Sequence, residues 1–233
     1  ISLAPHLALS FDRDKRDQEL KTAKLELMLG EARMAALRSQ LRPHFLFNSL
    51  NAISAYVETA PAVACSMLEQ VSDLLRMSLH HHESREIPLY EEFAFLGKYL
   101  GLQKLRFEDR LEISIRMEPD ASAALVPTFI LQPLVENAVR HGIAMRHERG
   151  TIEVNAWRNN GDLGISIRDD GPGLPAKWTI QELGTGLTNT RERLDALYGK
   201  GGQDRLNIRN APGGGVLVNL TLPFHVEETL PGK

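Results

Sequence analysis

The hydrophobic positions follow two different periods, which divide the chain into a helical part and a part rich in strands. Between residues 20 and 41 apolar side chains recur every seven residues, with a second set offset by three, namely Leu20, Leu27, Met34 and Leu41 with Ala23, Gly30 and Leu37. This spacing predicts a helix with a dimerising seam. Because the seam spans only three heptads and Gly30 weakens a helix by about 1 kcal/mol, packing within one chain stays an alternative to a coiled coil.

A second helix is predicted from about Pro61 to His80. Pro61 suits the first turn of a helix, and apolar residues recur on one face, namely Val63, Met67, Leu68, Val71, Leu74, Leu75 and Leu79. Two successive amphipathic helices form a hairpin that cannot cover both apolar faces alone. Two copies would form a four-helix bundle with a continuous core, so we expect a homodimer.

A third helix is predicted from Leu89 to Phe107, and beyond it the hydrophobic pattern alternates with a period of two. Strands are predicted at residues 111–117, 151–157, 163–168, 206–209 and 216–222, and helices at residues 129–143 and 187–198. The order of elements predicts an α+β fold, in which a helical hairpin that forms a dimeric four-helix bundle is followed by an α/β sandwich with helices on one face of a mixed sheet.

The changes of pattern also predict domain boundaries. We expect a signalling helix or coiled coil at residues 1–40, a dimerisation hairpin at 41–88, a connecting helix at 89–108, a sheet-containing domain at 109–225 and a tail at 226–233.

Composition and charge disfavour several classes of protein. Hydrophobic residues make up 42% of the chain and charged residues 24%, which is typical of a globular protein and not of a disordered one. The net charge of −3 supplies no basic field for nucleic acid or anionic lipid. The single cysteine, Cys65, has no partner for a disulfide within the chain. His80, His81 and His82 are adjacent and so do not share a helix face, which disfavours a metal site there.

The sequence contains no run of about 18 apolar residues, so we do not expect this stretch to span a membrane. Its apolar opening, Ile1 to Phe11, gives way abruptly to charged residues at 12–16. That change is typical of the cytoplasmic exit of a membrane segment, and an arbitrary start of the chain explains it equally well.

Three motifs in the second half carry candidate chemistry. Residues 136–141, Glu-Asn-Ala-Val-Arg-His, lie on a predicted helix, and amide and carboxylate oxygens suit Mg²⁺. Residues 169–173, Asp-Asp-Gly-Pro-Gly, follow a strand, and glycines there let the chain turn where side chains would block a planar ligand. Residues 184–187, Gly-Thr-Gly-Leu, open a helix whose N–H groups can receive phosphate oxygens. Taken singly, each motif also fits a surface helix or a tight turn.

Together, in this order and separated by strands, the three motifs resemble the N box and the two glycine boxes of the ATP-binding superfamily of gyrase, Hsp90, histidine kinases and MutL. The resemblance implies that residues 109–225 bind ATP and Mg²⁺. It implies that Asn137 holds Mg²⁺, with Glu136 as a further candidate ligand, and that Asp169 accepts a hydrogen bond from the adenine amino group. The nucleotide-binding residues that it implies are Asn137, Arg140, His141, Asp169, Gly171, Gly173, Gly184, Thr185, Gly186 and Leu187.

Residues 41–51, Leu-Arg-Pro-His-Phe-Leu-Phe-Asn-Ser-Leu-Asn, place Pro43 directly before His44 within a helical pattern. A proline kinks a helix and can turn the next imidazole outward, and neutral histidine is a nucleophile able to take a phosphoryl group. Judged from its apolar neighbours alone, His44 would be a core histidine. Asn48, one turn further on, could position a water that hydrolyses a phosphoaspartate.

This segment resembles the histidine box of LytS-type sensor histidine kinases, and residues 131–138, Leu-Gln-Pro-Leu-Val-Glu-Asn-Ala, resemble the same group. The resemblance covers roughly residues 35–223. It implies a protein-histidine kinase of a two-component system, in which ATP phosphorylates His44 and the phosphate passes to an aspartate of a response regulator with a LytTR DNA-binding domain. The position of Asn48 makes phosphatase activity a further expectation, and the net charge disfavours direct nucleic-acid binding. The full-length protein would be attached to the cytoplasmic side of a bacterial inner membrane through a segment absent from this soluble chain.

Two departures bear on the chemistry. In the commoner histidine kinases an acid directly follows the acceptor, whereas Phe45 stands here, so any base must come from elsewhere, and Glu136 is one candidate. ATPases of the superfamily carry a glutamate four residues before the metal asparagine, and Pro133 stands at that place. Proline cannot act as a base, which favours transfer to an internal acceptor over hydrolysis. A nucleotide-binding pseudokinase or scaffold and an ATPase of this superfamily remain alternative functions.

Overall fold

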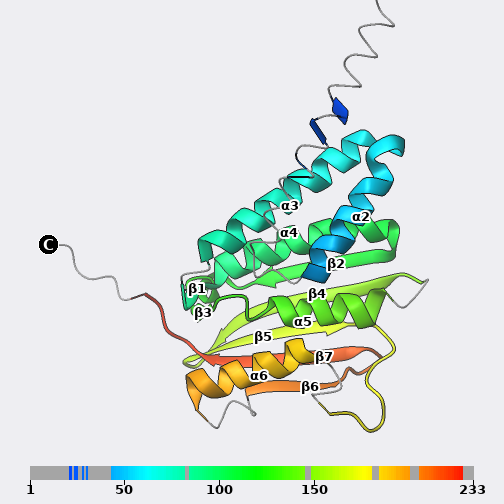
Figure 1. The fold of residues 1–233 in the computed structure, drawn as a ribbon. Helices are drawn as coiled ribbons and strands as arrows, with labels where there is room; N and C mark the ends of the chain where they lie inside the picture. Colours follow the sequence, from blue (N-terminus) through cyan, green and yellow to red (C-terminus); the bar gives the residue numbers. More distant parts are fainter. Residues whose placement is uncertain are drawn as a thin grey trace, which may run out of the picture. The chain divides into compact units, whose positions relative to one another are not determined.

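The computed structural model divides the chain into two compact units, residues 1–80 and 81–233 (Figure 1). It describes residues 21–22, 24–25, 28, 30, 43–81, 84–144, 148–179, 184–199 and 205–227. Of the predicted heptad positions only Gly30 lies among these residues. The predicted domain boundaries stay predictions.

The first unit contains a hairpin of two helices, α2 (Pro43–Thr59) and α3 (Pro61–His81), joined by Ala60. Apolar side chains spaced three and four apart are buried on each helix, namely Leu46, Leu50 and Ile53 on α2 and Ala64, Met67, Leu68, Val71, Leu74 and Leu75 on α3. Leu79 was predicted on the same face of α3, but its side chain is 53% exposed. The apolar stripe therefore ends before the last turn of the helix.

The second unit is built on a mixed five-stranded sheet, which confirms the predicted α+β class. Its strands are ordered β2-β4-β5-β7-β6, with bounds of Leu111–Met117, Gly150–Asn159, Asp162–Asp169, Val216–Pro223 and Leu206–Asn210 respectively. Strand β2 runs parallel to β4, and the other neighbours are antiparallel. Short 3₁₀ turns, η1 (Glu108–Arg110) and η2 (Pro119–Ala121), flank β2.

Helices α5 (Gln132–Asn137) and α6 (Thr185–Tyr198) lie over one face of this sheet, and α4 (Leu89–Phe107) contacts β2 (Figure 1). Side chains along β5 alternate, and those buried on one face are Leu163, Ile165, Ile167 and Asp169. Because Asp169 continues the period of the apolar residues, its carboxyl group is directed into the interior and not into solvent.

The helix predicted over residues 129–143 is interrupted at both ends. Its α-helical part begins only at Gln132, after a turn in which Phe129 adopts a φ of 57°, and after Asn137 it continues as a π-helical segment, η3 (Ala138–Ile143). Two strands that the pattern did not predict, β1 (Glu86–Pro88) and β3 (Leu125–Pro127), pair antiparallel. Each has three residues and ends in proline, too short for a period of two to show.

Glu92 of α4 is a buried carboxylate that holds the turn before α5. Its Oε2 accepts a hydrogen bond from the N–H of Phe129 at 3.0 Å, and its Oε1 accepts one from Leu131 at 2.9 Å. Burial raises the pKa of Glu92 to about 7, although these N–H groups and the charge of Arg193 act in the opposite direction. A carboxylate supplies two acceptor oxygens where an amide supplies one, which suits a turn presenting two N–H groups.

The raised pKa predicts that the stability of the second unit depends on pH through Glu92. The folded protein binds this proton more tightly than the unfolded chain, so the free energy of unfolding should fall as the pH rises from 4.5 to about 7. At 1.36 kcal/mol per pKa unit the fall is about 3 kcal/mol. Urea unfolding across this range should show the slope in the parent but not in Glu92→Gln. The control Glu91→Gln, next along α4, should keep the slope, and a persisting slope in Glu92→Gln would contradict the assignment.

Candidate nucleotide-binding site

The motif around Asn137 lies where an α-helix widens into a π-helix. Asn137 ends α5, and η3 carries Arg140 and His141 with exposed side chains; the N–H of Ala144 donates to the carbonyl of Val139, five residues back, at 2.9 Å. Single π turns within helices are frequent at functional sites. Partial burial, and to a lesser extent the charge of Arg140, lowers the pKa of His141, so its imidazole is predominantly neutral at pH 7.

The first glycine motif and the asparagine motif meet at two glycines. A Cβ added at Gly171 would lie 2.5 Å from the Cα of Gly142, and a Cβ added at Gly142 would lie 2.9 Å from the Cβ of Asp169. Real Cβ atoms do not approach so closely, so this backbone contact requires glycine at both positions. The contact joins segments about 30 residues apart in the sequence.

The carboxyl group of Asp169 is fixed by the backbone around it. Its Oδ1 accepts hydrogen bonds from the N–H groups of Gly171 at 2.9 Å and Val216 at 3.4 Å, and the residue is 6% exposed. The next residue, Asp170, accepts from the N–H of Thr151 at 2.9 Å and so ties the motif to the start of β4. Both carboxylates therefore stabilise the turn in addition to any contact with a ligand.

The loop after Gly173 is fastened by Asn210, which sequence reasoning did not identify. Gly173 has a φ of 80°, and the N–H of Leu174 donates to Oδ1 of Asn210 at 2.6 Å while Nδ2 of Asn210 donates to the Leu174 carbonyl at 3.3 Å. Sequence reasoning did not identify Gly215 either. A Cβ there would lie 1.9 Å from the carbonyl oxygen of Asp169.

The second glycine motif opens α6. Gly184 has a φ of 97°, and a Cβ added to it would meet no atom of the described residues within 4 Å, so these residues leave the backbone open at this point. The hydroxyl of Thr188 donates to the Gly184 carbonyl at 3.3 Å. Thr185 is exposed, whereas Gly186 and Leu187 are buried and anchor the first turn.

The donor set fits a nucleotide with a hard cation. Near the end of α5 Glu136 accepts a hydrogen bond from Nε2 of Gln132 at 2.8 Å, and Asn137 adds an amide oxygen. Among the described residues no group of three histidines, cysteines or acids could hold a metal ion. A Mg²⁺ ion here would draw most of its ligands from phosphate oxygens and water, as Mg²⁺ commonly does.

The predicted site residues are divided between the two units. Residues 136–142, 169–173 and the start of α6 all belong to the second unit. His44 and Asn48 lie on α2 in the first unit, and their side chains fall outside the described part of the chain.

Two family models match successive parts of the sequence. A model described as histidine kinase matches residues 32–111, and one described as histidine kinase-, DNA gyrase B- and HSP90-like ATPase matches residues 126–226. The chain belongs to the histidine kinase family. In the part of this family member that the structure describes, no helix is both long and apolar enough to cross a membrane.

The resemblance to LytS-type members of the histidine kinase family is also confirmed. The chain is 32% identical to the sensor protein LytS of Bacillus anthracis over 222 residues, which are 90% of this chain and 37% of that protein. It is 32% identical to LytS of Enterococcus faecalis over 211 residues, 86% of this chain and 36% of that protein. The chain thus spans a little over a third of these relatives. The histidine kinase domain of Erythrobacter litoralis EL346 is 18% identical with a TM-score of 0.46, over 87% of this chain and 96% of that one.

The contact between Gly215 and Asp169 predicts that Gly215→Ala disrupts the site. A methyl group at that position would overlap the Asp169 carbonyl, and the φ of 82° is itself unfavourable for alanine, so we expect a loss of several kcal/mol in the free energy of unfolding. Gly214→Ala is the matched control, since its φ of 107° is equally unusual but nothing lies within 4 Å. Thermal unfolding should show a much larger shift for Gly215→Ala, and equal shifts would contradict this account.

Proposed function

We propose that this chain is the catalytic portion of a sensor histidine kinase of a two-component system, which uses ATP and Mg²⁺ to phosphorylate its own His44. The phosphoryl group would then pass to an aspartate of a response regulator. Since the chain spans only part of its curated relatives, the stimulus-sensing part of such a protein is expected elsewhere.

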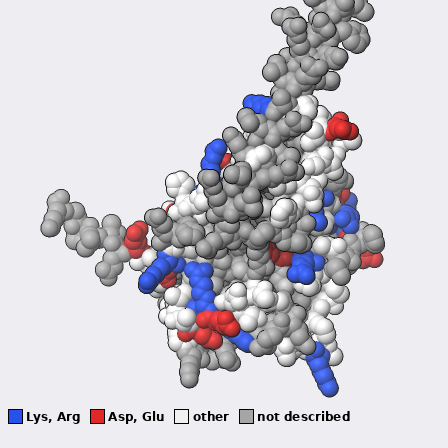
Figure 2. Space-filling view, viewed as in Figure 1, with Lys and Arg blue, Asp and Glu red and all other residues white. Residues whose placement is uncertain are grey.

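The observation that carries the proposal is the packing of Gly142 against Gly171 beside the Asp169 carboxyl group. This contact brings the asparagine motif and the first glycine motif to one place, as a nucleotide site formed by both requires. The open backbone of Gly184 supports a phosphate position at the start of α6. On the face that Figure 2 shows, acidic and basic side chains are interspersed, so recognition there would depend on local donors and not on a broad basic field.

Each motif would have a separate task in binding. Asp169, whose Oδ1 is oriented by the turn, would accept from the adenine amino group through Oδ2. The N–H groups of Gly184, Thr185, Gly186 and Leu187, with Arg140 and His141 of η3, would contact the phosphates. Asn137, with Glu136 as a candidate second ligand, would hold Mg²⁺, which neutralises phosphate charge when bound. Gly171 and Gly173 would let the backbone approach the base.

In the transfer itself an imidazole nitrogen of His44 would attack the γ-phosphorus. A nitrogen–phosphorus bond forms, the bond from the γ-phosphorus to the bridging oxygen breaks, and ADP leaves with the electron pair. The imidazole proton would pass to solvent or to Glu136, because Phe45 stands where an acid follows the acceptor in the commoner histidine kinases. Pro133 occupies the place of the hydrolytic glutamate, which favours this transfer over hydrolysis by water.

Further expectations accompany the kinase activity. Membership of the histidine kinase family supports a homodimer, in which the hairpin of α2 and α3 would supply half of a four-helix bundle. A response regulator with a LytTR DNA-binding domain is the expected acceptor, and Asn48 is the candidate residue for hydrolysing its phosphoaspartate. Membrane attachment would come from a segment outside this chain.

The kinase activity predicts that incubation with γ-labelled ATP and Mg²⁺ places acid-labile, base-stable phosphate on the protein. His44→Gln should abolish the label, because amide nitrogen is not a nucleophile, while leaving ATP binding unchanged. His80→Gln, at the end of α3, serves as the control and should label like the parent. A parent that binds ATP without becoming labelled would favour a scaffold, and steady release of inorganic phosphate by His44→Gln would favour an ATPase.

The proposed metal ligand predicts a magnesium-dependent binding defect. Asn137→Ala should weaken ATP binding in the presence of Mg²⁺ by about tenfold, which corresponds to about 1.4 kcal/mol. With the metal chelated, the parent and the variant should bind ATP equally, because only the metal contact has been removed. Calorimetry measures the ATP affinity with and without Mg²⁺. Asn207→Ala, which replaces an exposed asparagine on β6, is the control. An equal defect with and without Mg²⁺ would assign Asn137 to the nucleotide directly.

A further inference from the structure

The turn at residues 128–131 connects β3 to α5 and therefore sets where the asparagine motif begins. Phe129 in this turn has a φ of 57°, a conformation that non-glycine residues adopt at a cost. Such a conformation persists where the surrounding structure determines it. Here two side chains from different helices bind the turn. Glu92 accepts hydrogen bonds from its N–H groups, and Arg193 donates one to a carbonyl.

The N–H side of the turn is bound by Glu92 of α4. The two hydrogen bonds to Phe129 and Leu131 use both oxygens of a carboxylate that has no solvent exposure. Phe129 also packs its ring edge-on against Phe95 of the same helix, with the centroids 5.1 Å apart. The turn is thereby attached to α4 by polar and aromatic contacts together.

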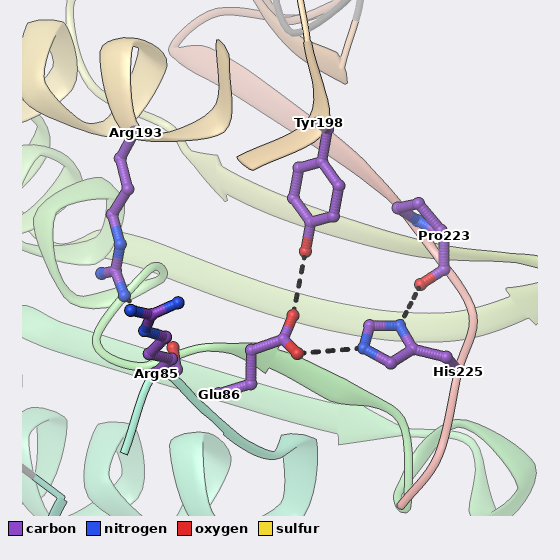
Figure 3. Close-up of polar contacts among 6 residues, drawn as sticks. All are labelled: Arg85, Glu86, Arg193, Tyr198, Pro223 and His225. Atoms are coloured by element: carbon purple, nitrogen blue, oxygen red, sulfur yellow. Dashed lines mark hydrogen bonds and ion pairs between the residues drawn. The ribbon is translucent and has the colours of Figure 1, made fainter. Parts of the chain in front are cut away.

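The carbonyl side is bound by Arg193 of α6, whose guanidinium points to the backbone of Arg85, the residue directly before β1 (Figure 3). Its Nη1 donates to the carbonyl of Thr128, and its Nη2 donates to the carbonyl of Arg85 at 3.5 Å. A forked, planar cation can serve two carbonyls at once, which an ammonium group on a single stem does less well.

The C-terminal end of α6 is attached to the same region. The hydroxyl of Tyr198 donates to Oε1 of Glu86 at 3.4 Å, and Nε2 of His225 lies 3.1 Å from Oε2 of the same carboxylate (Figure 3). Burial and then the charge of Glu86 raise the pKa of Tyr198 to about 12, so the hydroxyl keeps its proton at neutral pH. Helix α6 is therefore attached at two points along its length, through Arg193 to the carbonyl of Arg85 directly before β1 and through Tyr198 to Glu86 within β1.

These contacts connect the two helices that carry opposite parts of the candidate site. Asn137 lies six residues beyond Leu131, about 9 Å along a helix, and Arg193 lies seven residues beyond Gly186, about 10 Å. Helices α5 and α6 also contact each other directly. A shift at the turn would therefore move the asparagine motif relative to the second glycine motif by a similar amount.

We propose that Glu92 and Arg193 are positioning residues for the nucleotide site, which clamp the turn at residues 128–131 and so fix the asparagine motif relative to the start of α6. This inference rests on the proposed function, since it assigns both motifs to one bound nucleotide. Neither residue is placed in contact with ATP. Their effect would be on geometry, to which transfer rates are sensitive, since a misplacement of about 1 Å can cost about a hundredfold.

The test is autophosphorylation kinetics on the whole chain with Arg193→Met, Glu92→Gln and the double variant. We expect Arg193→Met to raise the apparent KM for ATP about tenfold and to lower the maximal labelling rate about tenfold, which is about 1.4 kcal/mol for each. The double variant should lose less than the product of the two single losses, because both residues hold one turn. Amide hydrogen exchange without nucleotide should quicken at residues 129–143 and stay unchanged in β4 and β5.

Arg191→Met, two residues away on α6, is the matched control and should leave KM, rate and exchange unchanged. If Arg193→Met does not fold, Arg193→Lys, which keeps the charge but not the forked donors, carries the same test. Partial unfolding alone would reduce the amount of labelled protein by the same factor at every ATP concentration and would leave KM unchanged. An unchanged KM in Arg193→Met would therefore overturn the inference. If the parent protein bound no ATP, both the proposed function and this inference would be overturned. That outcome is distinguishable from an unchanged KM in the variants, which would overturn this inference alone.

Discussion

The approach of the backbone at Gly142 to the backbone at Gly171 is the constraint on which the candidate site depends. A Cβ at either position would collide with Gly142 itself or with Asp169, and a Cβ at Gly215 would collide with the Asp169 carbonyl. Glycines from three separate segments thus surround one residue, Asp169. The helix that carries Asn137 has to bring Gly142 to this place, and its π-helical continuation begins in the residue after Asn137. Three parts of the unit therefore meet at Asp169, namely the end of β5, the turn between β6 and β7, and the helix of the asparagine motif. At these glycine positions no side chain larger than hydrogen fits.

The turn that leads to the asparagine motif contains two features that are unfavourable for stability. Glu92 is a carboxyl group without solvent exposure, and Phe129 adopts a φ of 57°, yet both belong to the turn that starts α5. Neither feature would improve stability by itself, because burial of a charge and a left-handed residue are each unfavourable. Costs of this kind are expected where position matters more than stability. Glu92 accepts hydrogen bonds from two backbone N–H groups, and these bonds offset part of the unfavourable free energy of burying its charge.

Local periodicity predicted most elements of the second unit, because burial on one face imposes a period of two on β4, β5 and β7. It failed where the cause is distant in the sequence. The start of α5 is set by Glu92, whose partner Leu131 lies 39 residues away, and in the sequence Glu92 is simply one of two acids in the first turn of a helix. Asn210, which binds Leu174 from 36 residues away, and the short pair β1 and β3 leave no periodic signal either. The glycine motifs were recognisable only in combination, and the placement of His44 relative to them depends on how the two units meet.

The division into units has a mechanical consequence for the proposed transfer. His44 belongs to the helical hairpin, whereas the motifs assigned to the nucleotide belong to the sheet-containing unit. A reaction of this kind needs a firmly held donor together with an acceptor that can approach and withdraw. The contacts of Arg193, Glu86 and Tyr198 lie within the second unit, close to where the chain enters it at β1. They can therefore fix the shape of the proposed nucleotide site within this unit, so that control of the proposed phosphorylation would lie in the approach of His44 and not in the shape of that site.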